Sequence, residues 1–421
     1  MNTTVHDPLW RQALAGAQML FVAFGALVLM PLITGMDPNV ALFTAGLGTL
    51  LFQIVTKRQV PVFLASSFAF IAPILAAKGQ FGMPAVLGGI VAAGVVYILL
   101  SAAVKMKGTG FIDRLLPPVV IAPVIMCIGL ALSPNAVHMA MGIDGSGTQL
   151  VAYETSIIIS MSTLIATLLV AVLGRGLFRL IPILIGIIVG VSLSIMFNII
   201  DSTAINQAPW FALPKFMLPE FHLGAILYML PVALAPAIEH IGGVVAIGNV
   251  TGNNYLQKPG LHRTLLGDGV ATSAAGFFGG PPNTTYSEVT GAVMLTKNYN
   301  PKIMTWAAVI AIVLAFIGKF GVALQSIPLP VMGGILCLLF GSIAVVGLNT
   351  LIRNQVDLSI PRNLIIVSVT LVFGIGGMKL GSGEFALTGI SLCALVAMLL
   401  NLILPGGSAW KRNPMEDPLI K

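Results

Sequence analysis

The stretch GGPPNTTYSEVTGAVML (279–295) places a proline pair and Glu288 inside an otherwise apolar segment. Proline cannot continue a helix, so this segment is predicted to be broken. Glu239 lies in the equally apolar stretch LYMLPVALAPAIEHIGG (227–243). An ionisable residue at membrane depth usually faces an internal cavity and marks a substrate or proton path. Broken membrane segments that carry an acid are how many transporters build a site near the midplane. The two glutamates therefore predict a transporter.

Composition indicates an all-α polytopic membrane protein without a soluble domain. The 421 residues are 57% hydrophobic and only 8% charged, and apolar runs of about 17–25 residues, the length of a membrane-crossing helix, recur throughout. The N-terminus lacks the basic and apolar regions of a cleaved signal peptide, so the first span is expected to be retained. The net charge of +7 is assigned to short loops rather than to nucleic-acid binding. The scattered Cys127, Cys337 and Cys393 predict core packing, not a disulfide or zinc site.

Fourteen transmembrane segments are predicted from the apolar runs. The third, ninth and tenth are weak as continuous helices because they are short and rich in Gly, Ser, Thr or Pro. The predicted spans are 12–34, 40–56, 61–77, 83–104, 117–134, 155–174, 179–199, 222–243, 263–280, 283–297, 303–323, 328–349, 362–378 and 386–404.

The distribution of basic residues predicts that both termini lie in the cytoplasm. Four of the 21 Lys and Arg residues fall outside in this topology, which leaves 21 − 4 = 17 on the cytoplasmic side. Such a bias follows the positive-inside rule and supports an even number of spans. The four outer residues are Lys78, Lys215, Lys319 and Lys379.

The chain also contains a weak internal repeat. A shift of 284 − 66 = 218 residues places Ser66-Ser67-Phe68 on Thr284-Thr285-Tyr286, and it places Gly25 on Gly243. Seven spans per unit is an odd number, so the second unit must be inverted relative to the first. Inverted repeats place the binding site near the midplane, between discontinuous helices.

The two broken segments, 60–70 and 281–288, are predicted to run extended for a few residues and then to start helices. Both begin near proline and hold β-prone residues, and their Ser and Thr residues are natural N-caps. Two half-helices of opposite direction would point free N–H groups at one place, where they could bind a ligand carbonyl.

The glutamates supply the complementary chemistry. Carboxylates of Glu239 and Glu288 accept hydrogen bonds from ring N–H groups, so amide donors plus these acceptors suit a flat lactam, such as a pyrimidinedione or an oxopurine. Phe68 and Tyr286 offer aromatic faces for stacking. A buried carboxyl can also take up a proton on one side of the membrane and release it on the other. Purely structural roles for the two glutamates are the alternative interpretation.

These motifs resemble the nucleobase–ascorbate transporter (nucleobase:cation symporter-2) family, and within it the bacterial uracil permeases. The resemblance covers nearly the whole chain, and two of the motifs, 276–297 and 327–334, are specific to the family. The stretches that carry it are FGALVLMPLI (24–33), SSFAFIAP (66–73), IEHIGG (238–243), KPGLHR (258–263), GFFGGPPNTTYSEVTGAVMLTK (276–297) and IPLPVMGG (327–334).

The resemblance implies fourteen spans in two inverted sevens, with short extended segments in spans three and ten. It implies a core domain, 1–110 and 222–325, that moves against a gate domain, 111–221 and 326–421. It also implies proton-coupled uptake of uracil across a bacterial inner membrane, by a homodimer without cofactors or enzymatic activity.

By position, Glu239 matches the family glutamate that grips the base, and Glu288 matches the glutamate beside it. Phe68 and Tyr286 match residues at the two strands that contact the base, and Ser287 would offer a backbone N–H. Some positions depart from the family. Gly243 stands where uracil permeases commonly have His and xanthine-type members have Asp, and Met19 and Val289 replace the usual His and Asn. The coupling role is therefore expected to rest on the glutamates.

Other residues and functions are interpreted more simply. His240 is expected to pack or to face the gate, because it lies about 100° around the helix from Glu239. Asp268 is expected to cap or pair structurally. A purine or broad nucleobase permease is the nearest alternative, since Gly243 leaves the base open. An anion exchanger or channel is disfavoured by two carboxylates, and an enzyme by the lack of a nucleophile, metal cluster or phosphate loop.

Overall fold

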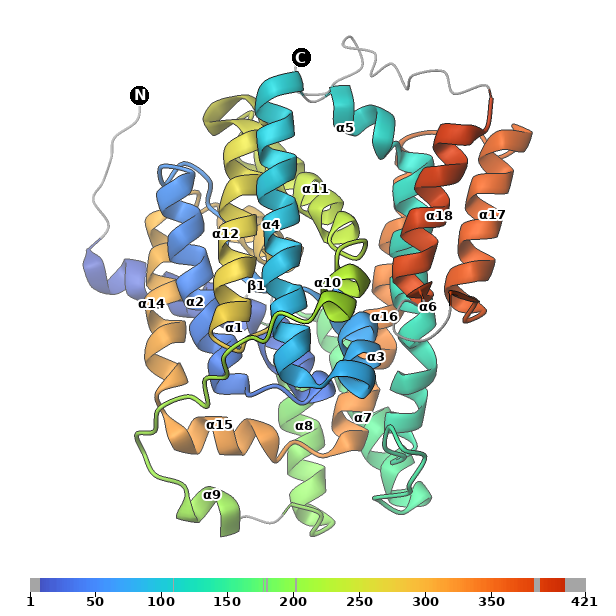
Figure 1. Ribbon diagram of the computed structural model, residues 1–421. Helices are drawn as coiled ribbons and strands as arrows, with labels where there is room; N and C mark the ends of the chain where they lie inside the picture. The colour runs from blue at the N-terminus through green and yellow to red at the C-terminus, as the bar shows by residue number, and fades with distance from the viewer. Residues whose placement is uncertain are drawn as a thin grey trace.

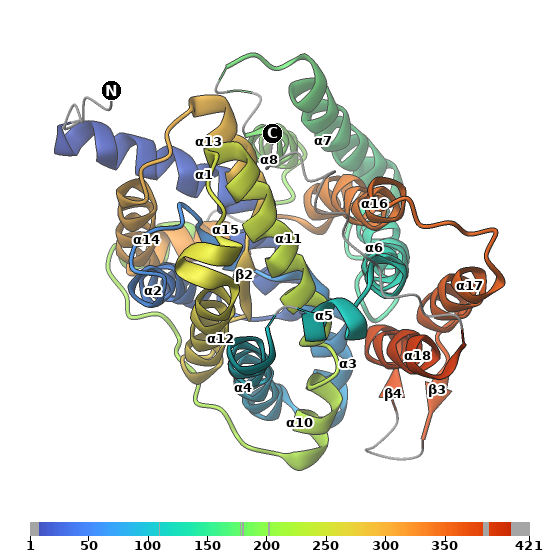
Figure 2. The ribbon, with the colours of Figure 1, turned by 90° about the horizontal axis from the view of Figure 1, so that it is seen from above.

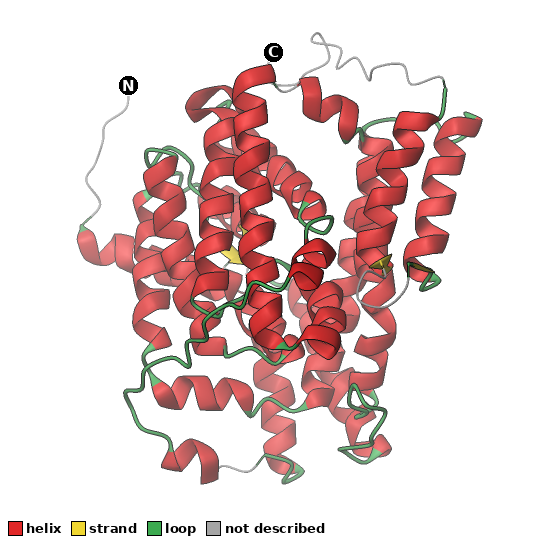
Figure 3. Ribbon diagram, in the orientation of Figure 1, coloured by secondary structure: helices red, strands yellow, loops and turns green. Residues whose placement is uncertain are grey.

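The computed structural model describes residues 8–108, 110–176, 178, 181–200, 203–381 and 387–405. These residues fold almost entirely into helices, with two pairs of very short strands (Figures 1 and 3). The elements are α1 (Leu9–Thr34), α2 (Pro38–Val55), β1 (Leu64–Ser66), the 3₁₀ turn η1 (Phe68–Phe70), α3 (Ile71–Phe81), α4 (Met83–Lys107), α5 (Gly110–Leu115), α6 (Pro118–Ala140), α7 (Tyr153–Leu173), α8 (Pro182–Met196), α9 (Thr203–Gln207), α10 (Leu223–Met229), α11 (Leu234–Thr251), the π turn η3 (Leu256–Gly260), α12 (Leu261–Phe277), β2 (Asn283–Thr285), α13 (Ser287–Thr296), α14 (Lys302–Ala315), α15 (Gly318–Gln325), α16 (Leu329–Arg353), α17 (Pro361–Ile375), β3 (Lys379–Leu380), β4 (Leu387–Thr388) and α18 (Gly389–Ile403).

Within the described residues, six helices are long and apolar enough to cross a membrane: α1, α2, α4, α6, α7 and α16. Shorter apolar helices include α8, α14 and α17. The chain is therefore an integral membrane protein. Two spans predicted as continuous helices are interrupted: span 222–243 is divided between α10 and α11, and span 303–323 between α14 and α15. The count of fourteen membrane crossings stays a prediction.

Local sequence explains where many helices begin and end. Proline occupies the first turn of α2, α4, α6, α8, α16 and α17, where its missing N–H costs nothing. Asp37 caps α2, and its carboxylate accepts hydrogen bonds from the backbone N–H groups of Asn39 (2.7 Å) and Val40 (3.3 Å). Gly35 ends α1 in the left-handed conformation, with a φ of 78°, which glycine adopts without strain.

The first set of helices packs through close backbone contacts. In this set α12 packs on α4 and α2, and α14 packs on α2 and α1. At the α4–α12 contact, a Cβ added to Gly94 would lie 2.6 Å from the carbonyl oxygen of Gly269, and one added to Gly269 would lie 2.7 Å from the carbonyl oxygen of Gly94. The two helices therefore touch backbone to backbone at this place.

A second set of helices packs in the same manner. In it α16 packs on α6 and α7, and α17 packs on α6 and α18. A Cβ at Gly129 of α6 would lie 2.3 Å from the carbonyl oxygen of Phe340, and one at Gly333 of α16 would lie 2.1 Å from the backbone nitrogen of Ala140. Seen from above, this set stands beside the first, with α11 between the two (Figure 2).

Strands β1 and β2 bring the two halves of the chain together inside the first set. They pair antiparallel, with Leu64 opposite Thr285, Ala65 opposite Thr284 and Ser66 opposite Asn283. All six residues are buried. This confirms the prediction that both proline-marked segments run extended before their helices start.

Candidate functional site

Each strand leads directly into the start of a helix. After β1, the chain enters η1 at Phe68 and then α3, and after β2 it enters α13 at Ser287. The first N–H groups of a helix have no partner within it, so both half-helices present backbone donors beside the strand pair. The predicted caps are wrong in detail. Ser67 precedes η1 but makes no side-chain capping bond, and Thr284 and Thr285 lie within β2, which leaves Tyr286 at the cap of α13.

Glu239 and Glu288 lie near each other at accessible positions. Protein surrounds both residues, yet the side chains of both are exposed, and their carboxyl groups interact electrostatically. A Cβ added to Gly242, one turn after Glu239, or to Gly291, one turn after Glu288, would have no heavy atom within 4 Å. The structure thus brings the two predicted acids together at an accessible place. Glu288 lies in the first turn of α13, where a negative charge is favoured by the helix dipole.

Part of α16, in the second set of helices, is uncovered. Gly341 of α16 also has no heavy atom within 4 Å of an added Cβ. Before it, Leu339 and Phe340 are buried, whereas Ser342, Val345 and Val346 after it are exposed. One face of α16 is therefore uncovered after Phe340, whereas Gly347 stays buried, with an added Cβ 2.6 Å from the carbonyl oxygen of Ala122.

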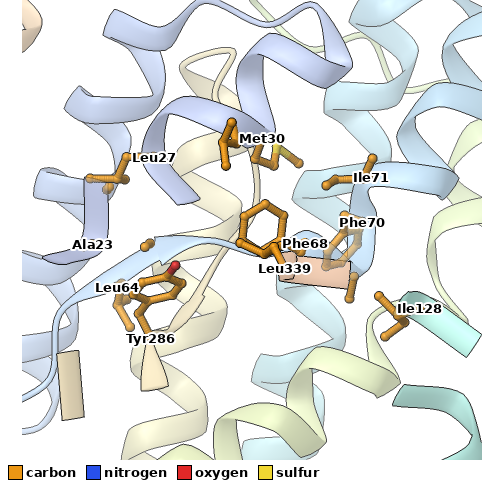
Figure 4. Close-up of a cluster of buried hydrophobic side chains, with 14 of the residues drawn as sticks. Ala23, Leu27, Met30, Leu64, Phe68, Phe70, Ile71, Ile128, Tyr286 and Leu339 are labelled. Atoms are coloured by element: carbon orange, nitrogen blue, oxygen red, sulfur yellow. The ribbon is translucent and has the colours of Figure 1, made fainter. Parts of the chain in front are cut away.

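The two predicted aromatic residues are buried rather than open. Phe68 is 9% exposed and Tyr286 is 6% exposed. Figure 4 shows Phe68 in a hydrophobic cluster with Met30, and it shows Leu339 of α16 approaching the same cluster. Their rings therefore pack on apolar neighbours in this structure. Ser287, the remaining predicted site residue, begins α13, so that its backbone N–H belongs to the first turn.

Polar side chains anchor the strand pair to the helices behind it. The side-chain amide of Asn283 donates to the carbonyl oxygens of Thr44 (3.1 Å) and Ala271 (3.4 Å). The hydroxyl of Thr272 donates to the carbonyl oxygen of Asn283 (2.8 Å), and the backbone N–H of Leu64 donates to the hydroxyl of Thr49 (2.9 Å). These bonds fix the strands, and with them the starts of both half-helices, against α2 and α12.

Gly243 lies where α11 touches β2. A Cβ at this position would lie 2.6 Å from the hydroxyl oxygen of Thr285. Gly243 therefore lies against the strand pair, on the same helix as Glu239.

The side-chain amide nitrogen of Gln18 on α1 is buried without a hydrogen-bond partner among the described residues.

His240 and Asp268 form a sealed pair behind Glu239. Nδ1 of His240 lies 3.3 Å from Oδ2 of Asp268, and both side chains are fully buried. The ring of Phe52 contacts the imidazole edge to face, with centroids 6.1 Å apart. The structure thus packs His240 against Phe52 and pairs it with Asp268, away from the accessible position of Glu239. Nothing in the sequence identified them as each other's partner, since they lie on different helices.

The site offers two kinds of hydrogen-bonding group to a ligand. Carboxylate acceptors come from α11 and α13, and backbone donors come from the starts of the two half-helices. A flat neutral molecule with adjacent N–H and C=O groups matches this pattern. Among the described residues, no group of three or more His, Cys, Asp or Glu side chains is arranged to hold a metal ion.

Comparisons with known proteins agree with this arrangement. The model of the Permease family matches residues 11–383. The chain is 58% identical to the "Probable uracil permease" of Pasteurella multocida, over 97% of this chain and 96% of the relative, and 45% identical to the "Uracil permease" of Bacillus caldolyticus, over 95% and 93%.

Solved structures share the fold at low identity. The transmembrane domain of the cyanobacterial bicarbonate transporter BicA has a TM-score of 0.64 at 17% identity, covering 94% of this chain and 98% of that one. The murine anion transporter Slc26a9 in its inward-facing state has a TM-score of 0.71 at 9% identity, covering 95% and 68%. The family model and the two uracil-permease relatives that align over nearly their full length show that the chain belongs to the Permease family.

Proposed function

We propose that the protein transports uracil across the membrane by alternating access. The observation that carries this proposal is the exposed pair Glu239 and Glu288 beside the paired strands β1 and β2. Uracil has two ring N–H donors and two carbonyl acceptors, which match the carboxylates and the backbone donors of the half-helices. The names of relatives that align over nearly the full length, "Probable uracil permease" and "Uracil permease", support the same substrate.

Uptake is coupled to protons in this proposal. Uracil is neutral at physiological pH, so the membrane potential alone cannot concentrate it, and a cation must enter with it. Glu288 is the main coupling residue, because its carboxyl group is accessible and lies next to the acid that grips the base. Phe68, Tyr286 and Ser287 complete the site, the last through its backbone N–H.

The two sets of helices act as the moving parts. The core comprises residues 1–110 and 222–325 and contains the first set, and the gate comprises residues 111–221 and 326–421 and contains the second set. With both termini in the cytoplasm of a bacterium and the chain in its inner membrane, Arg353 at the end of α16 lies on the cytoplasmic side. A homodimer is the expected assembly.

Uptake of labelled uracil tests the proposal. Cells that lack their own uracil permease should accumulate labelled uracil when they express this chain, and a protonophore should abolish the accumulation. The Glu239→Ala variant, expressed to the same level, is the matched control. Failure of the wild-type chain to accumulate uracil would contradict the proposed substrate, and uptake that follows sodium instead would contradict the proposed coupling.

A purine is the second candidate substrate. Gly243, four residues after Glu239, leaves no side chain where the family resemblance implies His in uracil permeases and Asp in xanthine-type members. The open space beside Gly242 and Gly291 favours a larger base. Competition of labelled uracil uptake by xanthine separates the two. The anion transporters share the fold only, and two carboxylates at the site disfavour an anionic substrate.

A further inference from the structure

The pair formed by His240 and Asp268 has no role in gripping the substrate, because both side chains are sealed from the space that Glu239 faces. Among the described residues, His240 is the only basic side chain within ion-pairing distance of Asp268. Both ring nitrogens of His240 and both carboxyl oxygens of Asp268 lack a well-oriented hydrogen bond to any described residue. A buried acid whose only cationic partner is an imidazole is an unusual structural element, since the pair is neutral only when it holds a proton.

The groups around the pair are acids or apolar rings. Glu239 on α11 and Tyr97 on α4 interact electrostatically with Asp268, and Glu288 on α13 interacts with Glu239. Helix α2 contributes the ring of Phe52. Strand β2, which also contacts α11 and α12, contributes no titratable side chain. The imidazole of His240 is therefore the only base in a cluster of three carboxyl groups.

The charge of this cluster is limited by its surroundings. An ionised carboxylate without a partner in a low-dielectric interior costs several kcal/mol, and neighbouring like charges add to the cost. A proton held by the pair, on either the carboxyl or the imidazole, removes one negative charge next to Glu239. Ionised Glu239 then costs less, and an ionised carboxylate is the stronger acceptor for the N–H groups of a ligand. Proton binding by the pair thus favours substrate binding by Glu239.

We propose that His240 and Asp268 act together as a second proton-holding site of the transporter, in addition to Glu288. The pair takes up one proton as uracil binds to Glu239, and it releases that proton after uracil leaves on the other side. No other bond changes. Linkage makes the effect reciprocal, so bound uracil favours proton uptake by the pair to the same degree. The inference rests on the proposed function and gives the chain a coupling imidazole despite Met19 and Gly243. His240 and Asp268 are positioning residues, because they act through Glu239.

Proton uptake on uracil binding tests the inference directly. Calorimetry of the purified full chain, in buffers that differ in ionisation enthalpy, gives the number of protons taken up per uracil bound. Asp268→Asn and His240→Gln should still bind uracil but lose at least about half of the proton uptake, because each removes one member of the pair. The matched control is Asp37→Asn, the same change at a helix cap that Asn also fills well, and it should match the wild type.

The outcomes separate this inference from the proposed function. A wild-type protein that does not bind uracil refutes the function itself. If the wild type binds uracil with proton uptake, and the variants take up as many protons with the same pH profile, the proton-holding role of the pair is refuted. The proposed function then stands. Since both residues are buried and their variants can misfold, Glu288→Gln supplies an independent measurement. It should retain residual proton uptake on uracil binding, and a complete loss of uptake in that variant also overturns the inference.

Discussion

The backbone N–H of Ser67 donates a 2.9 Å hydrogen bond to the carbonyl oxygen of Pro282, in the other half of the chain. In return, the backbone N–H of Tyr286 donates to the carbonyl oxygen of Phe63 at 3.3 Å. These two bonds extend the β1–β2 pair at both ends. They hold the starts of the two half-helices together, so the donors of one half-helix and the acid of the other reach a common site.

Removal of the charge on Glu239 should weaken uracil binding. Glu239→Gln keeps the size of the side chain but replaces a charged acceptor, a loss of about 1.5–3 kcal/mol, which corresponds to roughly a 10- to 150-fold increase in Kd. Binding of labelled uracil to the purified variant measures the effect. Glu154→Gln, an exposed acid in the first turn of α7, serves as control and should bind like the wild type. An unchanged Kd for Glu239→Gln would remove this residue from the site.

Glu288→Gln should separate substrate exchange from accumulation. The amide mimics a permanently protonated carboxyl, so the variant should still exchange labelled for unlabelled uracil in proteoliposomes. It should fail to concentrate uracil when a proton gradient is imposed. Exchange and gradient-driven uptake are measured on the same vesicles. Accumulation equal to that of the wild type would show that Glu288 is not the main coupling residue.

Asn283→Ala should destabilise the protein more than expected from the few side-chain atoms that the substitution removes. The change removes the two hydrogen bonds that the Asn283 amide donates to the buried carbonyl oxygens of Thr44 and Ala271, at a cost of about 1–3 kcal/mol for the two. A lower midpoint of thermal unfolding in detergent checks this. Asn206→Ala, at an exposed position in α9, is the control. Equal midpoints for the two variants would mean that the amide of Asn283 does not anchor β2.

Gly94→Ala should destabilise the α4–α12 contact by about 1–3 kcal/mol, the usual cost of overpacking. The added methyl group would lie 2.6 Å from two backbone atoms, the oxygen of Gly269 and the nitrogen of Ser273, so the helices must separate. Gly79→Ala is the matched control, because a Cβ at Gly79 of α3 meets nothing within 4 Å. This control should be neutral or slightly stabilising, since alanine favours helix. Thermal unfolding compares the two, and a Gly94→Ala midpoint at or above that of Gly79→Ala would contradict the close contact.

Proline positions made the central part of the fold predictable. The Pro-Pro pair at 281–282 and Pro61 mark both extended segments, and Glu239 and Glu288 stand out because charge is rare in apolar runs. The break between α10 and α11 had a similar signal in Pro231 and Pro236, which lie inside an apolar run that reads as one span.

Other features depend on contacts between distant segments. The break between α14 and α15 carries no proline. It is held by tertiary hydrogen bonds from Ala212 to the carbonyl oxygen of Phe316 and from Gly318 to that of Trp210, both 3.0 Å. The partnership of His240 with Asp268 likewise arises from the packing of α11 on α12. No periodicity within a single helix contains that information.

The glycines of this protein fall into two kinds, and the difference has a practical use. Several inside the two sets, such as Gly94 and Gly129, lie against backbone, whereas a Cβ added to Gly242 on α11 or to Gly341 on α16 meets no heavy atom within 4 Å. Reporter groups attached to cysteines at these two positions would therefore fit without disturbing either set. Each set is held rigid by its own backbone contacts. The distance between spin labels attached at these two positions would therefore report how the two sets move relative to each other. A distance distribution with two maxima would then reveal both end states of the transport cycle in a single sample.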